Sequence, residues 1–295
     1  MFLSKLDSLG DALKLIGENQ KFMDTEVIPL HEAHKRVLAE DIMAYHNSPP
    51  FDKSAMDGFA LKGENTFGAS QSNPKTLKIV DAIGAGDFCD KTINEGEAIV
   101  LATGAPIPEG ADAVLMKEYT TTDGDELTIY SQVTPGENVS PKAEDIEKGN
   151  QILSKNTFIR YQEMGLIASA GYAEVEVYKK PRIKVIITGN ELVEPTKDEI
   201  DKAKIINSNK YVIKSMIEDS GAIATISHAG DTFDEVRTEI LKSSEEYDVV
   251  MTTGGTAISK GDVVLDVVDD LGEILLHGVA IRPGKPIGAG IVNGK

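Results

Sequence analysis

The sequence predicts a multidomain α/β protein. A small α/β domain carries an inserted β-rich module and is followed by a three-layer α/β domain built on a parallel sheet. The length of 295 residues exceeds what one ordinary domain needs. The first half holds a Gly- and Pro-rich stretch of strand-like runs, and the second half alternates strand and helix patterns. The expected boundaries are 1–46 with 147–179 for the discontinuous small domain, 47–146 for the inserted module and 180–295 for the last domain.

The first zone predicts two helices, at Asp7–Ile16 and Leu30–Ile42. Both segments carry apolar residues at three- and four-residue spacing, which is typical of one buried helix face. Pro29 stands just before the second segment, where proline commonly starts a helix.

The second zone predicts a β-rich module followed by a helix. Asp123-Gly124 separates two strand-like runs and predicts a tight hairpin turn. The helix is expected at Tyr161–Ala170, in a segment that packs back on the first zone. The expected strands are Leu77–Ile83, Ala98–Thr103, Ala113–Tyr119 and Leu127–Val133.

The third zone predicts a β-α-β-α-β unit, and therefore a parallel sheet with right-handed crossovers. Its first helix starts near Ser208 and is stopped by Gly221. Its second helix begins at a capping box formed by Thr232 and Glu235. The expected strands are Ile183–Thr188, Ile223–Ser227 and Asp248–Thr252.

Small residues and carboxylates follow each of these strands. Glu191 and Asp231 lie after the first and second, and Gly254-Gly255 after the third leads on to Asp262. Ligands of open parallel sheets bind beyond the carboxyl ends of the strands. Small residues let backbone N–H groups approach a phosphate, and neighbouring carboxylates suit Mg²⁺. We therefore expect a nucleotide or phosphorylated small molecule with Mg²⁺.

Two purely structural interpretations of these residues remain open. Asp231 could serve only as a helix cap, and Gly254-Gly255 could be only a tight turn. In the segment Ala280–Pro286, Arg282 and Lys285 put two cations on a rigid Pro-Gly turn. Paired cations suit an oxyanion, although solvated surface charges are the alternative.

The composition bears on partners and compartment. The chain has 30 basic and 48 acidic residues, a formal net charge of −18. Nucleic acid and anionic membranes both require a basic face, so neither is expected as a partner. The single cysteine, Cys89, has no partner for an internal disulfide, and no apolar run is long enough to cross a membrane. A cytoplasmic protein is predicted.

Several long motifs resemble those of the molybdopterin molybdenumtransferases, the MoeA and gephyrin E-domain family. The resemblance runs in order along nearly the whole chain and includes the Thr-Gly-Asn-Glu segment, the Gly-Gly loop and the Arg-Pro-Gly-Lys-Pro segment. The motifs of the β-rich module are Ser54–Ala60 after Pro50-Phe51-Asp52, Thr103–Pro106, Pro108–Asp112, Gly136–Val139 and Glu144–Ile146.

This resemblance implies a reaction, cofactors and partners. It implies insertion of molybdate into adenylylated molybdopterin with release of AMP, in the presence of Mg²⁺. It also implies a homodimer, with a cleft between the last domain of one subunit and the β-rich module of the other. The upstream molybdopterin adenylyltransferase is a candidate partner. A non-catalytic scaffold protein of the same family and a tungstate-inserting homologue are the alternative functions.

The resemblance also assigns roles to individual residues. Asp57, Thr103, Glu191 and Asp262 are the expected catalytic residues, and Asp231 with Asp262 would hold Mg²⁺. Arg282 and Lys285 would hold molybdate. The other expected ligand-binding residues are Ser54, Asp145, Gly254, Gly255, Ser259 and Pro286.

The end of the sequence predicts a hairpin turn. Ile287–Val292 reads as a strand, and Asn293-Gly294 is a strong turn signal. The resemblance implies a further C-terminal β domain that this sequence lacks. We therefore expect this chain to be inactive in insertion while still able to bind the adenylylated pterin.

Overall fold

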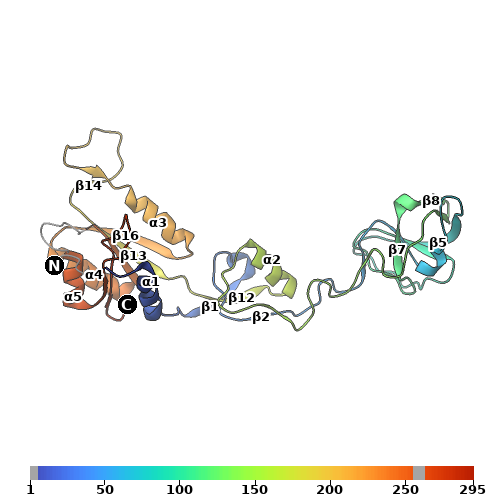
Figure 1. Ribbon diagram of the computed structural model, residues 1–295, viewed down its shortest axis with the longest axis horizontal. Helices are drawn as coiled ribbons and strands as arrows, with labels where there is room; N and C mark the ends of the chain where they lie inside the picture. Colours follow the sequence, from blue (N-terminus) through green and yellow to red (C-terminus); the bar gives the residue numbers. More distant parts are fainter. Residues whose placement is uncertain (1–5, 255–262) are drawn as a thin grey trace. The chain divides into compact units, whose positions relative to one another are not determined.

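The computed structural model (Figure 1) describes residues 6–254 and 263–295. Its contacts divide the chain into two compact units. The multidomain α/β class predicted from the sequence is confirmed. The expected domain boundaries stay a prediction. Unit 1 comprises Met1–Ile28, Lys35–Ala39 and Glu176–Lys295, and unit 2 comprises Pro29–His34 and Glu40–Val175.

Unit 1 is built on a parallel sheet of order β16-β13-β17. Its strands are β13 (Arg182–Thr188), β16 (Ile223–Ala229) and β17 (Val249–Thr253), so the three predicted strands and their parallel pairing are confirmed. The helices around the sheet are α3 (Asn209–Asp219), α4 (Phe233–Glu246) and α5 (Val263–Leu271).

The alternation of side chains along β13 explains the three layers. Val185 and Ile187 share a buried cluster with Ile217 of α3. Ile186, which points to the opposite face, clusters instead with residues of α4 and α5, including Val236. Helices therefore cover both faces of the sheet.

The rest of unit 1 contains α1 (Leu9–Asn19) and a hairpin of β18 (Gly272–His277) and β19 (Gly288–Val292). The helix expected at Asp7–Ile16 is confirmed, with Ser8 as its N-cap and a later end. The buried Ala12 of α1 packs beside the hairpin. Two short strands, β14 (Leu192–Val193) and β15 (Ile205–Ile206), pair in parallel.

The turn predicted after β19 is confirmed. Asn293 and Gly294 both have positive φ, at 53° and 72°. The Lys295 N–H donates to the Val292 carbonyl at 3.0 Å, which closes the turn.

The helix predicted at Leu30–Ile42 is wrong. Only a 3₁₀ turn forms, η1 (Leu30–Glu32), and Lys35 then takes a left-handed conformation at φ 62°. The backbone beyond it bonds to another segment, because the Ala39 N–H donates to the Glu176 carbonyl at 2.9 Å. The apolar spacing marked buried residues correctly, but these residues are buried by an extended segment.

Unit 2 contains α2 (Tyr161–Ala170), which has the predicted bounds. Three two-stranded sheets are also present. The division between the units passes through one of them, the pair β1–β12. The paired strands are β1 (Thr25–Pro29) with β12 (Glu174–Tyr178), β2 (Ile42–Met43) with β11 (Gln151–Leu153), and β3 (Lys53–Ser54) with β10 (Val139–Ser140).

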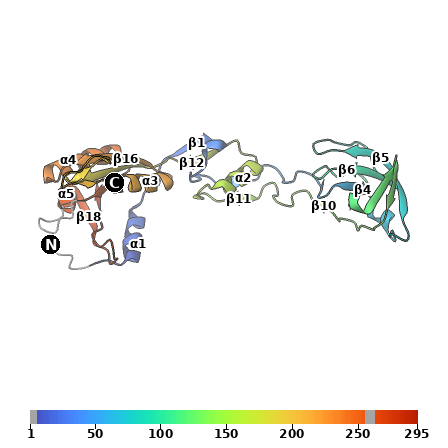
Figure 2. The same cartoon turned by 90° about the horizontal axis from the view of Figure 1, so that it is seen from above.

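A six-stranded sheet of order β7-β4-β6-β5-β9-β8 forms the β-rich module. Figure 2 labels three of its strands, β4, β5 and β6. The four strand-like runs in the sequence form β5, β6, β7 and β9, but β7 ends at Met116 and β9 at Ile129, earlier than predicted. The sequence did not predict β4 or β8, and β8 forms the hairpin with β9 at the expected Asp123-Gly124 turn. The strands are β4 (Gly58–Leu61), β5 (Lys75–Ile83), β6 (Glu97–Leu101), β7 (Ala113–Met116), β8 (Thr120–Asp123) and β9 (Glu126–Ile129), with 3₁₀ turns η2 (Gly63–Thr66) and η3 (Lys117–Tyr119).

Both faces of this sheet are covered by apolar side chains. Phe59 and Leu61 of β4 join one buried cluster, and Ala60 joins the other together with Ile99. Because β4 is buried on both faces, it lacks the alternating polar pattern that identifies a strand in a sequence.

Candidate functional site

The start of β4 lies beside the ends of both neighbouring strands. Strand β4 pairs antiparallel with β6 on one side and with β7 on the other, so Gly58 lies opposite Leu101 and Met116. A Cβ at Gly58 would lie 2.1 Å from the Leu115 carbonyl oxygen, so only glycine allows this close approach. The residue before β4, Asp57, is thereby placed between the segments that follow β6 and β7.

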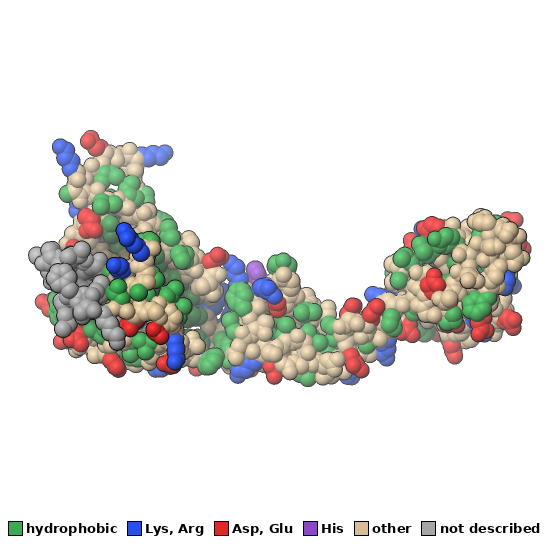
Figure 3. All heavy atoms as spheres, viewed as in Figure 1, with side chains coloured by type: hydrophobic (Ala, Val, Ile, Leu, Met, Phe, Trp, Pro, Cys, Tyr) green, Lys and Arg blue, Asp and Glu red, His purple; other side chains and the backbone are tan. Residues whose placement is uncertain are grey.

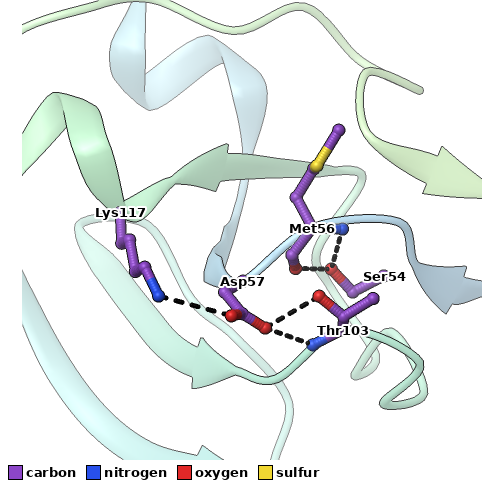
Figure 4. A network of polar contacts seen from close by, with 5 residues as sticks. All are labelled: Ser54, Met56, Asp57, Thr103 and Lys117. Carbon is purple, nitrogen blue, oxygen red and sulfur yellow. Dashed lines mark hydrogen bonds and ion pairs between the residues drawn. The ribbon is translucent and has the colours of Figure 1, made fainter.

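Asp57 receives hydrogen bonds from both sides (Figure 4). Its Oδ1 accepts from the Thr103 backbone N–H at 2.8 Å and from the Thr103 hydroxyl at 2.7 Å. Its Oδ2 lies 3.3 Å from the Lys117 Nζ. The structure therefore brings together Asp57 and Thr103, which were predicted as site residues, and adds Lys117.

These donors lower the pKa of Asp57 to about 2. The Thr103 backbone N–H has the largest effect, followed by the Thr103 hydroxyl and then by Lys117. Asp57 is therefore ionised at neutral pH and can act as a hydrogen-bond acceptor, but it holds no proton to donate.

Ser54 shapes the loop that carries Asp57. It is buried, with 1 % of its surface exposed. Its hydroxyl donates to the Met56 carbonyl at 2.6 Å (Figure 4). Its own carbonyl accepts from the Gly104 N–H at 2.8 Å. The structure thus gives Ser54 an internal role beside Thr103, and its predicted contact with a ligand stays a prediction.

Asp145 lies on a different part of unit 2. Its N–H donates to the Ser48 carbonyl at 2.9 Å, and its side chain is exposed. Among the described residues, no hydrogen bond or ion pair joins it to Asp57 or Thr103.

In unit 1, the loops after the three parallel strands meet at one edge of the sheet. The Asn190 N–H, after β13, donates to Asp231 Oδ2, after β16, at 3.0 Å. The Thr188 hydroxyl donates to the Thr253 carbonyl of β17 at 3.2 Å. A Cβ at Gly254, which has φ 94°, would lie 2.5 Å from the Thr188 carbonyl oxygen. Glycine is thus needed there for close packing.

Asp231 is not the cap of α4. Thr232 holds that position, and its side chain forms the predicted capping box with Glu235. Asp231 instead ties the loop after β16 to the loop after β13, and its side chain is exposed. The interpretation of Asp231 as a helix cap is therefore wrong.

Glu191 lies at the same edge with an exposed side chain. Its carboxylate folds back over Gly189, within 2.8 Å of where a Cβ would stand. The Gly189 carbonyl lies 3.0 Å from His228 Nε2, and Lys204 Nζ donates to the Asn190 carbonyl at 2.6 Å. Sequence reasoning did not find Lys204, because it stands in a stretch without strand or helix periodicity.

Several predicted site residues cannot be placed at this edge. Gly255, Ser259 and Asp262 lie outside the described residues. Arg282 and Lys285 lie on the segment between β18 and β19, where the Lys285 carbonyl accepts from the Val279 N–H at 3.0 Å. Over 6–254 and 263–295, no hydrogen bond or ion pair links the segment that contains Arg282, Lys285 and Pro286 to the sheet edge. Their grouping with the acids stays a prediction.

The residues at the sheet edge fit a Mg²⁺ ion in their chemistry. Asp231 offers hard carboxylate oxygens, of which only one accepts the Asn190 N–H, and Asp262, the second predicted ligand, lies outside the described residues. Within the described residues no group of three His, Cys, Asp or Glu side chains could hold a metal. Mg²⁺ is commonly bound by one or two carboxylates together with water and substrate phosphates, so two protein ligands suffice.

Acidic and basic side chains are intermingled on the face of the molecule shown in Figure 3.

In the described part of the chain, no helix is both long and apolar enough to cross a membrane.

Comparisons with known proteins define the class first. The model "MoeA N-terminal region (domain I and II)" matches residues 7–171, and the model "Probable molybdopterin binding domain" matches residues 184–295. The class is that of proteins of molybdenum cofactor biosynthesis. Together these models match most of the chain.

Individual relatives agree with this class. The molybdopterin molybdenumtransferase of Staphylococcus aureus strain COL is 36% identical over 287 residues, which is 97% of this chain and 68% of the relative. That of Staphylococcus epidermidis is 36% identical over 292 residues, 98% of this chain and 69% of the relative. The crystal structure of a molybdopterin biosynthesis MoeA protein from Pyrococcus horikoshii OT3 superposes with a TM-score of 0.82 at 33% identity, over 97% of this chain and 72% of that one. The chain belongs to the molybdopterin molybdenumtransferase (MoeA) family, as the motifs predicted.

Proposed function

We propose that this protein inserts molybdenum from molybdate into adenylylated molybdopterin and releases AMP. The observation that carries the proposal is the family match, which covers both units in order and includes the segments that hold Asp57 and Asp231. The positions of Asp57 and Asp231 support the proposal further, because each carboxylate accepts a hydrogen bond from a neighbouring loop.

In this proposal Asp57 binds substrate as an ionised acceptor. Its Oδ1 is occupied by two donors from Thr103, so Oδ2 is the oxygen that can accept an additional N–H or O–H from the ligand. Thr103 keeps the carboxylate ionised and oriented, and the buried Ser54 holds the neighbouring loop in place.

The sheet edge of unit 1 binds the phosphate end of the substrate. Backbone N–H groups can approach phosphate oxygens closely here because glycines stand at 189, 230 and 254. Mg²⁺ held by Asp231 and Asp262 would offset the charge on the phosphate when AMP leaves. Glu191 lies beside this edge as an exposed carboxylate, and Arg282 with Lys285 would bind the molybdate oxyanion.

The proposal includes a homodimer and cytoplasmic localisation. Light scattering of the purified chain is expected to give twice the monomer mass, and a monomer mass at all concentrations would contradict the dimer. The upstream adenylyltransferase remains a candidate partner, which a pull-down with purified enzyme would test.

The function is tested by incubating the purified chain with adenylylated molybdopterin and Mg²⁺, with either molybdate or tungstate. Calorimetry measures binding of the pterin, and chromatography measures released AMP. The proposal predicts binding together with AMP release that is greater with molybdate than with tungstate, whereas the expectation drawn from the sequence is binding without AMP release. Binding without AMP release would support the inactivity expected from the sequence, and the absence of both would contradict the proposed function. Equal or greater turnover with tungstate would favour the tungstate-inserting alternative.

A further inference from the structure

We propose that Lys117 is a positioning residue for Asp57, which fixes the second carboxylate oxygen and offsets the carboxylate charge so that an anionic substrate can approach. This inference rests on the proposed function, because it takes Asp57 as a substrate contact. It assigns a role to a residue that the sequence motifs did not indicate, since Lys117 stood inside an expected strand, Ala113–Tyr119.

The backbone places Lys117 beside Asp57 before any side-chain contact is made. Strands β4 and β7 pair from Gly58↔Met116 onward, and Lys117 directly follows β7. The Lys117 N–H donates to the Asp57 carbonyl at 3.2 Å, which extends the ladder by one bond. The close approach of β4 and β7 at Gly58 therefore fixes the position of the Lys117 backbone beside Asp57.

The donors divide between the two carboxylate oxygens of Asp57. Thr103 supplies both hydrogen bonds to Oδ1, and Lys117 Nζ is the donor recorded at Oδ2 among the described residues, at 3.3 Å (Figure 4). Without Lys117 the orientation of Oδ2 would depend on Thr103 alone. Because a carboxylate oxygen can accept more than one hydrogen bond, Lys117 leaves Oδ2 able to accept from a ligand.

Charge gives Lys117 a second effect. Adenylylated molybdopterin and molybdate are both anions, and the chain has a formal net charge of −18. An unpaired Asp57 would repel them, whereas an ammonium group at 3.3 Å makes the local pair nearly neutral.

Because both side chains are exposed, we expect the Asp57–Lys117 ion pair to affect ligand binding more than the stability of the fold. The side chains of Lys117 and Asp57 are 60% and 51% exposed. Exposed ion pairs contribute little to folding. Replacing Lys117 should therefore leave the fold intact, which makes the inference testable by substitution.

The same module offers a matched control. Lys91 and Asp81 form an ion pair at 3.0 Å with side chains 56% and 37% exposed. Asp81 belongs to β5, which pairs with β6 but not with β4 or β7, and among the described residues no hydrogen bond or ion pair joins Asp81 to Asp57, Thr103 or Lys117. Lys91→Met removes a comparable pair without touching the proposed site.

The first arm of the test measures the positioning itself. Carbon NMR of protein labelled at Asp carboxyl carbons follows the titration of Asp57, with the signal assigned by Asp57→Asn. In Lys117→Met the pKa of Asp57 is expected to rise from about 2 but to stay below 3.8, because Thr103 still donates to Oδ1, and Lys117→Arg should restore the low value. Lys91→Met should leave the Asp57 signal unchanged. An unchanged titration in Lys117→Met would overturn the inference and leave the proposed function standing.

The second arm measures ligand affinity by calorimetry at low and high salt. Lys117→Met is expected to weaken binding of adenylylated molybdopterin about five- to tenfold at low salt and less at high salt. In the Asp57→Asn background, Lys117→Met should cause no further loss of affinity, because the carboxylate charge that Lys117 offsets is absent. An equal loss in the Asp57→Asn background would overturn the inference, since Lys117 would then contact the ligand itself. Absence of binding by the wild-type chain would refute the proposed function and the role of Lys117 in ligand approach, while the titration arm still decides the positioning of Asp57.

Discussion

The two regions that carry candidate site residues hold their carboxylates in different ways. In the β-rich module, Asp57 accepts three hydrogen bonds from Thr103 and Lys117, and its pKa falls to about 2. At the sheet edge of unit 1, Asp231 accepts one backbone N–H and faces solvent. The first carboxylate is oriented in advance, and the second keeps most of its lone pairs available.

This difference follows from how each region is built. Asp57 stands where a central antiparallel strand begins between the ends of two neighbours, so donors reach it from both sides. Asp231 stands beyond the end of a parallel strand, where successive loops meet and glycines keep the backbone close. The first arrangement suits a fixed hydrogen-bond acceptor, and the second suits a cation and a phosphate.

The largest expected effect is on the oriented carboxylate. Asp57→Asn removes the charged acceptor while keeping its size. The ligand, adenylylated molybdopterin, then loses a hydrogen bond to a charged acceptor, so its affinity should fall about ten- to a hundredfold. Calorimetry measures the affinity, and circular dichroism confirms the fold. Asp81→Asn is the control and should bind normally; equal losses in the two variants would contradict the assignment of Asp57.

The second prediction concerns the open carboxylate. Asp231→Asn should abolish most of the increase in affinity that Mg²⁺ brings, about tenfold, because the amide oxygen is a poorer ligand for a cation. Binding is measured with Mg²⁺ and with EDTA. Thr232→Ala alters the cap of α4 at the next residue and should cost about 1 kcal/mol of stability without changing the Mg²⁺ effect. A Mg²⁺ effect that survives Asp231→Asn would remove this residue from the metal site.

Regular periodicity made most of the fold predictable. The parallel strands of unit 1, the capping box at Thr232 and the bounds of α2 all follow from local patterns in the sequence. The prediction of a helix at Leu30–Ile42 was wrong because apolar spacing indicates burial and not a particular backbone conformation. Here an extended segment buries the same residues and bonds through its backbone to β12. Strand β4 was missed because it is buried on both faces.

The candidate site was predictable only in part. The motifs pointed to Asp57 and Thr103, and the strand ends pointed to Asp231, because these residues stand in recognisable segments. Lys117 was not found because its relation to Asp57 depends on the pairing of β4 with β7, which joins residues far apart in the sequence. Which neighbour completes a site is decided by strand register, and no local pattern in this sequence specifies that register.

The third prediction tests the close approach that orients Asp57. A Cβ at Gly58 would lie 2.1 Å from the Leu115 carbonyl oxygen, so Gly58→Ala must separate β4 from β7. We expect a loss of about 1–3 kcal/mol in the free energy of unfolding, as for overpacking in a core. Urea unfolding measures it. Gly165→Ala on α2 meets no atom within 4 Å and should stabilise the chain by about 0.5–1 kcal/mol. Equal stability of wild type and Gly58→Ala would contradict the packing described here.

The smallest expected effect is on stability in acid. The pKa of Asp57 is lowered from 3.8 to about 2 by Thr103 and Lys117, so folding favours the ionised form. Its contribution is fully present above pH 4 and is lost as the pH falls through 2. Wild type should therefore be slightly more stable than Asp57→Asn at pH 6, and the difference should shrink between pH 4 and pH 2. The effect is small because the carboxylate is half exposed. Urea midpoints measured for both proteins across this range test the prediction. In Lys117→Met the pH range over which the stability contribution of Asp57 changes should be narrower, because one of its donors is removed. A difference that stays constant down to pH 2 would show that the donors of Asp57 do not favour its ionised form in solution.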